Sequence, residues 1–172
     1  MNDLKEQLRK ESLRLHEDTE HTFKAHFVTA EKWENLNLCL GIPSIVLSVM
    51  AGSLALSKIV PYFEILAGIF GFAAATFTAL LTFLKPIDRY EKRLKCGNRY
   101  LALRNDMRRF FEIELYTDKS DNELKAFLDT LISKKKELDV ESPLILNWAY
   151  KKAKERIKSG EAEYEVDKDA KK

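Results

Sequence analysis

The feature that most constrains this chain is a pair of long segments without any charged residue. Residues 36–56 and 65–84 contain no Asp, Glu, Lys or Arg, and only a short connector, residues 57–64, separates them. A helix rises about 1.5 Å per residue, so a segment of about 20 residues spans roughly 30 Å, the thickness of the hydrocarbon core of a bilayer. The sequence therefore predicts a transmembrane helical hairpin, residues 36–84, with its outer turn at 57–64.

A buried hairpin inside a soluble helical protein is the alternative. The first segment contains six Leu, two Ile and two Val, the second contains four Leu, two Ile and four Phe, and neither has a polar face. A soluble helix of this length keeps one polar side toward water. The rest of the chain, about 120 residues, is too short to surround two helices that are apolar on every side. We therefore favour a transmembrane hairpin over a buried hairpin in a soluble protein.

The charge balance excludes some partners and predicts an orientation. The 172 residues include 29 basic and 27 acidic side chains, and both signs are interleaved on either side of the hairpin. This gives no reason to expect nucleic acid as a partner. The connector holds one basic residue, Lys58, whereas seven basic residues flank the other ends of the two segments: Lys24, Lys32, Lys85, Arg89, Lys92, Arg93 and Lys95. The positive-inside rule then places both termini in the cytoplasm.

The expected fold is an all-α membrane protein built as one compact unit around the hairpin. A cytoplasmic N-terminal helix, residues 1–35, contains no Gly or Pro that would separate it from the first span. A cytoplasmic helical region, 85–160, follows the second span, and a flexible tail is expected at 161–172. We expect the two arms to form a helical bundle and the chain to form a homo-oligomer, because two spans alone cannot enclose a channel.

Local signals add detail to the region after the hairpin. A series at seven-residue steps, which Arg108 interrupts, predicts the packed side of a helix beginning near Pro86, with members Ile87, Leu94, Leu101 and Leu115. Ser120 and Glu123 have the spacing of a capping box. Ser142 and Pro143 predict the N-cap and first turn of a final helix.

Small residues at helical spacing run along both spans. Such residues allow helix backbones to approach closely within a membrane. They either pack helices together or, where they carry hydroxyl groups, also line a pore formed by several hairpins, and both interpretations stay open. The candidates are Ser44, Ser48, Gly68, Gly71, Ala75, Thr78 and Thr82. Pro43 and Pro86 are hinge candidates, because proline lacks the backbone N–H that a helix uses.

Sequence patterns for catalysis are missing. The chain has no Gly-rich phosphate loop, no triad and no Cys/His metal pattern, so we expect neither an enzyme nor a cofactor nor a metal site. His16 and Glu20 are four residues apart, as are Glu17 and His21, and such pairs could share a cation on one helix face. A third ligand at suitable spacing is lacking, so a solvated face with local ion pairs is the preferred interpretation. With only two cysteines, free thiols are expected rather than a disulfide framework.

Several of these features occur together in a known family. The first span is centred on Pro43 and ends in Ala51-Gly52, and the second closes with the sequence TFLKP, which ends at Pro86. Arg89 follows, and then the sequence NRYLALRNDMR with Asn98, Tyr100 and Leu103. Over roughly residues 20–160, this layout and these motifs resemble the SLATT family, the SMODS- and SLOG-associating two-transmembrane effectors.

The resemblance implies a bacterial anti-phage effector of the inner membrane, encoded beside a sensor such as a cyclic-oligonucleotide synthase. Activated copies would oligomerise and permeabilise the membrane, so that the infected cell dies in an abortive infection. The resemblance carries over no catalytic residue and no nucleotide contact. The alternative is a two-span membrane anchor or scaffold whose cytoplasmic helices recruit a partner without conducting. A solute transporter is less favoured, because no charge lies deep in either span.

Overall fold

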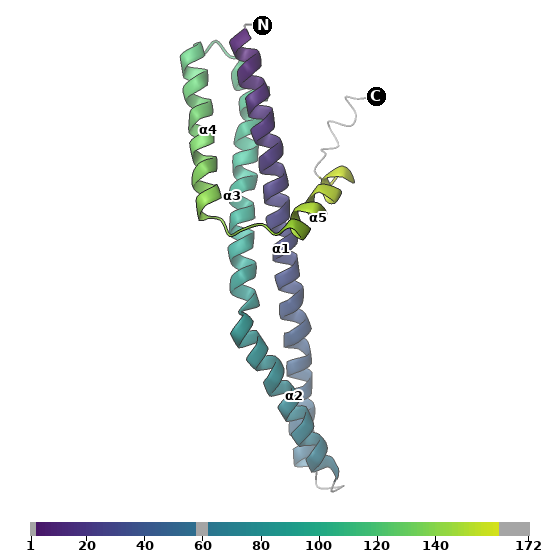
Figure 1. Ribbon diagram of the computed structural model, residues 1–172. Helices are drawn as coiled ribbons and strands as arrows, with labels where there is room; N and C mark the ends of the chain where they lie inside the picture. The colour runs from purple at the N-terminus through teal and green to yellow at the C-terminus, as the bar shows by residue number, and fades with distance from the viewer. Residues whose placement is uncertain (1–2, 58–61, 162–172) are drawn as a thin grey trace. The chain divides into compact units, whose positions relative to one another are not determined.

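A computed structural model describes residues 3–57 and 62–161 of the chain, which are helical apart from short connections (Figure 1). No strand occurs among these described residues. The all-helical class predicted from the sequence is confirmed. The elements in order are α1 (Asp3–Leu56), α2 (Tyr62–Leu84), α3 (Pro86–Glu112), the 3-10 helix η1 (Glu114–Tyr116), α4 (Asp121–Glu141) and α5 (Asn147–Lys158).

Contacts divide the chain into two compact units rather than the single one expected. The first unit comprises Met1–Thr29 and Lys92–Lys172, and the second comprises Ala30–Glu91. The first unit therefore joins the N-terminal arm to the region after the hairpin, as the predicted bundle requires. α1 belongs to both units, because it runs from Asp3 to Leu56 without a break.

The core of the first unit lies between α1, α3 and α4. On α3 the buried side chains follow steps of four and three residues, which keeps them on one side of a helix: Cys96, Tyr100, Leu103, Met107 and Phe110. All of these except Cys96 pack with Leu8 and Phe23 of α1 and with Leu124, Leu128, Leu131 and Leu138 of α4.

The predicted seven-residue series on α3 therefore has the wrong phase. Leu101 is only partly buried, and Ile87 is 45% exposed. Leu115 is buried, but it belongs to η1 rather than to α3. The larger side chains of Tyr100, Met107 and Phe110 fill the space between α1, α3 and α4. The side of α3 that carries them is therefore the buried side.

Ion pairs connect the helices across this core. Arg104 of α3 donates to Glu20 of α1 at 2.8 Å, and both side chains are largely buried. Lys135 of α4 lies 2.7 Å from Asp18 of α1 and 2.8 Å from Asp139. A buried charge without its partner costs more than the pair contributes, so these contacts favour one arrangement of the helices over others.

The start of α4 confirms the predicted capping box. The Ser120 backbone N–H donates to the Glu123 carboxylate at 2.8 Å, and the Glu123 N–H donates to the Ser120 hydroxyl at 3.4 Å. These bonds satisfy two donors that the first turn of a helix leaves unpaired.

The predicted helix start at Ser142 and Pro143 is wrong. Ser142 ends α4, where its N–H donates to the Leu138 carbonyl at 2.9 Å, and α5 begins only at Asn147. Arg93 of α3 donates to the carbonyls of Pro143 and Leu144, both at 3.0 Å. Because a partner far away in sequence binds these carbonyls, the segment stays extended instead of continuing as a helix.

Two predicted segments lie mostly outside the described residues. Of the outer turn, 57–64, residues 58–61 are not described, and residues 62–64 form the first turn of α2. Of the tail, 161–172, only Glu161 is described, and its carboxylate accepts from Lys24 at 3.3 Å.

Gly97 marks a close approach of α3 to α1. A Cβ atom at this position would lie 2.6 Å from Cδ1 of the Phe27 ring, much closer than carbon atoms pack. Glycine costs a helix interior about 1 kcal/mol relative to alanine. Its presence here therefore follows from the space that the Phe27 ring occupies.

We expect the effect of Gly97→Ala to change sign with the residue at position 27. In the wild-type background the new methyl group overlaps the ring, and overpacking of about 1–3 kcal/mol outweighs the gain in helix propensity. In a Phe27→Ala background the ring is gone, so the same substitution should stabilise by up to about 1 kcal/mol. Urea unfolding of the purified full-length proteins measures the four-variant cycle. Equal effects in the two backgrounds would contradict this packing.

Two histidines of α1 are held neutral in the first unit. The pKa of His16 and of His26 is lowered from 6.5 to about 4, mainly by burial and secondarily by nearby guanidinium groups: Arg104 and Arg108 beside His16, and Arg93 beside His26. The His26 ring also stacks on Tyr100, with ring centroids 5.6 Å apart. Protonation would place a cation in an apolar and already positive environment.

We therefore expect acid to destabilise the first unit. Below pH 6.5 the two histidines become protonated in the unfolded chain but stay neutral in the folded unit. The free energy of unfolding therefore falls as the pH drops from 6.5 toward 4. Each histidine contributes up to about 1.4 kcal/mol per pH unit. His26→Phe keeps a ring against Tyr100 and should remove about half of this dependence. Urea midpoints followed by Trp148 fluorescence in a Trp33→Phe background test this. The same pH slope with and without His26 would contradict it.

Candidate functional site

The candidate site is the contact between the two apolar helices of the second unit. Ser44 of α1 is buried, and its hydroxyl lies 2.7 Å from the hydroxyl of Thr78 on α2. Both hydroxyls also reach the Ala74 carbonyl, Ser44 at 3.3 Å and Thr78 at 3.0 Å. Two of the predicted candidates thus meet directly and bond the helices to each other.

Small side chains allow this approach. Ala67 and Ala74 are the buried residues of α2, and a Cβ atom placed on Gly71 would lie 4.0 Å from Cβ of Ala51 on α1. The spacing of Ala67, Gly71, Ala74 and Thr78 alternates four and three residues, which describes one side of a helix. Close backbone approach through such residues is how apolar helices associate when the surroundings are also apolar.

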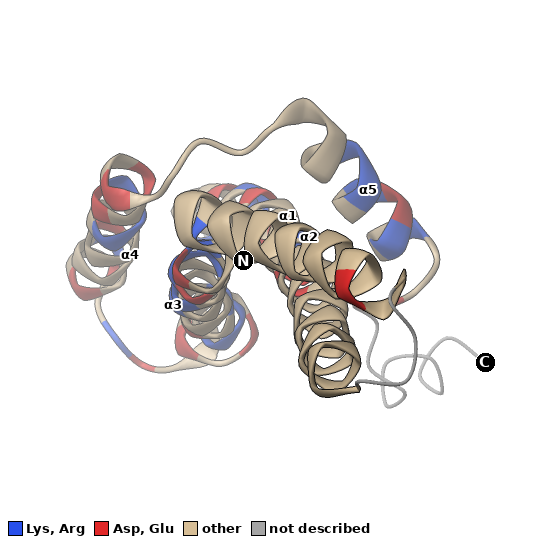
Figure 2. Ribbon diagram, turned by 90° about the horizontal axis from the view of Figure 1, so that it is seen from below, with Lys and Arg blue, Asp and Glu red and all other residues tan. Residues whose placement is uncertain are grey.

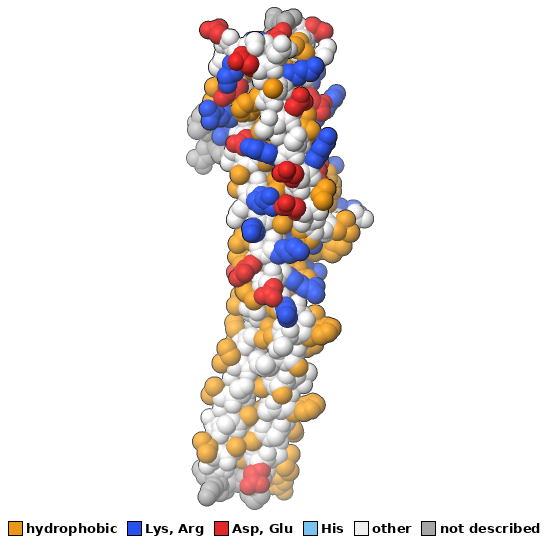
Figure 3. All heavy atoms as spheres, turned by 90° about the vertical axis from the view of Figure 1, so that its left-hand side faces the viewer, with side chains coloured by type: hydrophobic (Ala, Val, Ile, Leu, Met, Phe, Trp, Pro, Cys, Tyr) orange, Lys and Arg blue, Asp and Glu red, His pale blue; other side chains and the backbone are white. Residues whose placement is uncertain are grey.

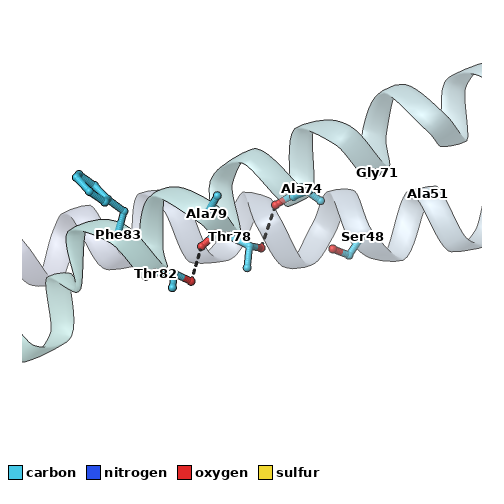
Figure 4. A pocket seen from close by; sticks show the side chains of 9 residues that line it. Ser48, Ala51, Gly71, Ala74, Thr78, Ala79, Thr82 and Phe83 are labelled. Carbon is cyan, nitrogen blue, oxygen red and sulfur yellow. Dashed lines mark hydrogen bonds between the residues drawn. The ribbon is translucent and has the colours of Figure 1, made fainter.

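A groove of about 970 Å³ runs beside this contact (Figure 4). Its walls are short side chains from both helices, with one aromatic ring: Ser48, Ala51, Gly71, Ala74, Ala75, Thr78, Ala79, Thr82 and Phe83. Five of the seven predicted candidates therefore line it, namely Ser48, Gly71, Ala75, Thr78 and Thr82. Phe83 is 82% exposed, so a large ring stands beside an otherwise shallow surface.

The hydroxyl groups of the groove are satisfied within their own helices. Ser48 donates to the Ser44 carbonyl at 2.8 Å, and Thr82 donates to the Thr78 carbonyl at 2.9 Å (Figure 4). Each hydroxyl uses its one proton in this way and keeps oxygen lone pairs that can accept. The groove therefore offers hydrogen-bond acceptors without carrying an unpaired donor at these positions.

The remaining candidates lie elsewhere on the hairpin. Gly68 is exposed, and a Cβ atom there would meet no other atom within 4 Å. α1 continues through Pro43 without interruption, so no helix ends there. Pro86 is buried and begins α3, directly after Lys85, which has the left-handed φ of 45°. The break between α2 and α3 thus falls at the predicted proline.

Most of the surface of the two apolar helices is uncovered. Each of the helical segments Asp3–Leu56 and Tyr62–Tyr116 contains an 18-residue window, of mean hydropathy 2.0 and 1.9, of which only 6% is buried. By length and composition both could cross a membrane. Large side chains point away from the hairpin contact, among them Ile45 (67% exposed) and Phe72 (78%). In Figure 2 the ribbon of α2 is almost entirely tan, the colour of residues that are neither basic nor acidic, and the lower part of the face in Figure 3 shows almost no blue or red side chain.

Of the two pairs noted on α1, Glu17 and His21 do approach each other, with the carboxylate 3.9 Å from His21 Nε2, whereas His16 and Glu20 have other partners. Glu20 binds Arg104, and the His16 ring packs edge-on against Phe111 with centroids 5.3 Å apart. Within residues 3–57 and 62–161, no three His, Cys, Asp or Glu side chains are close enough to hold a metal ion.

Sequence reasoning missed Ala74, whose carbonyl lies within hydrogen-bond distance of both hydroxyls at the centre of the contact. The predicted candidates on the second span include Ala75 instead, the next residue in the chain, which lies about 100° further around the helix. The alternating steps that include Ala67 and Ala74 could have identified the contact side.

Comparison with known proteins adds no assignment. No family model, no curated protein and no solved structure matches the chain.

We expect cysteines at positions 51 and 71 to form an intrachain disulfide. The Cβ separation of 4.0 Å lies within the range of about 3.5–4.5 Å that disulfides need. The test uses Ala51→Cys with Gly71→Cys, after Cys39 and Cys96 are replaced by alanine. After mild oxidation and denaturation, intact mass after maleimide labelling should show no free thiol.

The matched control moves one cysteine by a single position. Gly52→Cys with Gly71→Cys should label at both thiols, because position 52 is exposed and a Cβ atom there meets nothing within 4 Å. Full labelling of the 51–71 pair would show that the helices do not meet as described.

Proposed function

We propose that this chain is a two-span membrane protein that assembles into a homo-oligomeric pore and permeabilises the bacterial inner membrane when triggered. The observation that carries the proposal is the uncovered apolar surface of α1 and α2, since only 6% of the 18-residue apolar window of each helix is buried. A soluble monomer rarely exposes contiguous apolar surface of this extent. Lipid would cover it without cost, since hydrocarbon is the solvent such side chains prefer.

The groove supports an oligomeric pore. Two helices cannot enclose a channel, so neighbouring copies must supply the remaining walls. The groove side of the hairpin holds only short side chains and acceptor oxygens, apart from Phe83. Facing a central axis, this side would offer a narrow path bounded by Ser48, Thr78 and Thr82, while the large residues such as Ile45 and Phe72 would face lipid.

The biological role follows from the resemblance to the SLATT effectors. In that role the chain would act in an anti-phage, abortive-infection system, with a sensor encoded nearby, such as a cyclic-nucleotide synthase, as its trigger. Both termini would lie in the cytoplasm, because basic residues crowd the ends of the hairpin that lead to the two arms. The pore needs no catalytic residue and no cofactor.

A second candidate is a two-span anchor or scaffold that recruits a partner through its helical arms. One observation favours it: the hydroxyls of Ser44, Ser48, Thr78 and Thr82 all have partners within the hairpin. Such bonds explain the hydroxyls by packing alone. The two functions differ in whether ions cross the membrane.

We expect the protein, when triggered by its genomic neighbour or by phage, to depolarise the cell. A voltage-sensitive dye reports this in bacteria that express it. Ala75→Leu and Thr82→Leu add bulk to the groove without touching the Ser44–Thr78 contact, so each should reduce depolarisation to the untriggered level. Phe72→Leu changes the exposed side of the same helix and serves as the matched control.

Equal membrane abundance of all variants is confirmed by immunoblotting. If cells with either groove variant still depolarise, the groove does not line the pore. Polarised cells under every triggering condition, with the protein in the membrane, would favour the anchor.

A further inference from the structure

The connection between α4 and α5 exposes apolar side chains. Leu144 is 81% exposed and Leu146 is 50% exposed, whereas Ile145 between them packs against the buried cluster that α1 and α5 form together: Ala25, Val28, Ala149 and Ala153. This is the alternation of an extended segment, with one side buried and the other facing outward. Trp148, at the start of α5, is also partly exposed, by 36%.

These side chains are held in place from the buried side. The Arg93 guanidinium bonds the carbonyls of Pro143 and Leu144, both at 3.0 Å, and the N–H groups of Ala149 and Tyr150 donate to the Leu146 carbonyl. The backbone on either side of the exposed leucines is therefore fixed. A binding surface that is already ordered loses less entropy when it binds.

Basic side chains continue this surface along α5. Ala149 and Ala153 are fully buried against α1, so at about 100° per residue the opposite side of the helix carries Lys151, Lys154 and Lys158. All three lysines are exposed, as is Lys152. Glu155 is the single acidic residue in α5, and Figure 2 shows the lysine and arginine colour along this helix.

The residues that hold this surface are close to the hairpin in the sequence. Val28, which packs against α5, precedes the charge-free segment at Leu36 by eight residues of one continuous helix, about two turns. Arg93 follows Leu84 by nine residues. The points that hold the α4–α5 connection and α5 are therefore near both ends of the hairpin along the chain.

We propose that residues 142–158 form a peripheral docking surface for the anionic phospholipids of the bilayer that the hairpin spans, with Leu144, Leu146 and Trp148 entering the interface and Lys151, Lys154 and Lys158 binding headgroup phosphates. This inference rests on the proposed membrane location of the hairpin. The combination of apolar and aromatic side chains with adjacent lysines is typical of segments that lie in a membrane interface. The lysines give the charge complementarity, since each basic residue near an anionic surface strengthens docking roughly five-fold.

The test measures contact between Trp148 and lipid in the full-length protein. In a Trp33→Phe background, Trp148 is the only tryptophan of the chain. The protein is reconstituted into vesicles of phosphatidylcholine alone or mixed with phosphatidylglycerol, with and without brominated acyl chains. We expect bromine to quench Trp148 in the phosphatidylglycerol vesicles only, and we expect high salt to weaken the quenching.

Charge variants test the lysines. Lys151→Gln, Lys154→Gln and Lys158→Gln together should lower the ratio of docked to undocked protein roughly 100-fold and abolish the quenching. Lys125→Gln, Lys134→Gln and Lys136→Gln remove the same charge from exposed positions of α4, so quenching should persist. Quenching that is equal in the two lipids, or equal in the two triple variants, would overturn the proposal.

Alkaline extraction of the vesicles separates this inference from the membrane proposal. A chain that is extracted does not span the bilayer, which would overturn both. A chain that is retained while Trp148 stays unquenched would overturn the docking surface alone. Loss of Trp148 accessibility to acrylamide with rising protein density, without any lipid dependence, would assign the surface to a second copy and likewise overturn the lipid proposal.

Discussion

The second unit depends on a contact between two apolar helices. If lipid surrounds them, the hydrophobic effect does not favour their association, because lipid is as apolar as the helices. Ala51, Gly71 and Ala74 bring the backbones close, and the Ser44 and Thr78 hydroxyls meet at 2.7 Å over the Ala74 carbonyl. Dispersion between close backbones and a hydrogen bond in an apolar environment then provide the attraction. A side chain as large as leucine at the buried Ala74 would separate the helices and break the bond.

The same constraint explains what the rest of the hairpin is free to do. Because the contact uses only one side of each helix, large side chains such as Ile45 and Phe72 occupy the outer sides, and short ones form the groove beside the contact. A pore requires that neighbouring copies use the groove, whereas an anchor requires only the contact itself. The hydroxyl bonds serve the contact in both cases, so permeation rather than packing distinguishes the two functions.

The first unit is held together by different physics. Its core is a water-excluding cluster around Tyr100, Met107 and Phe110, crossed by ion pairs such as Arg104 with Glu20. Neutral His16 and His26 belong to that core, which makes its stability depend on pH below neutrality. Its outer surface carries many charged side chains and also exposed apolar ones, among them Val140 and the leucines before α5. If these leucines enter the membrane interface as we propose, the unit has a second attachment to the bilayer besides the hairpin.

The sequence by itself determined the features that depend on neighbouring residues. α1 ends at Leu56 and α2 at Leu84, the ends of the charge-free segments, because hydropathy and the following Lys85-Pro86 pair act locally. The capping box at Ser120 likewise needs only a residue three positions away.

Tertiary structure decided the features that depend on distant partners. The buried side of α3 follows Met107 and Phe110 rather than the predicted series, since α1 and α4 together choose the side that fills their common space. Ser142 ends a helix instead of starting one, because Arg93, about fifty residues earlier, binds the carbonyls that follow it. Ala74 rather than Ala75 lies at the hairpin contact, since the position of Ser44 on the facing helix determines where a carbonyl can be reached. In each of these three cases the local sequence was compatible with more than one structure, and contacts with residues distant in sequence determined which one formed.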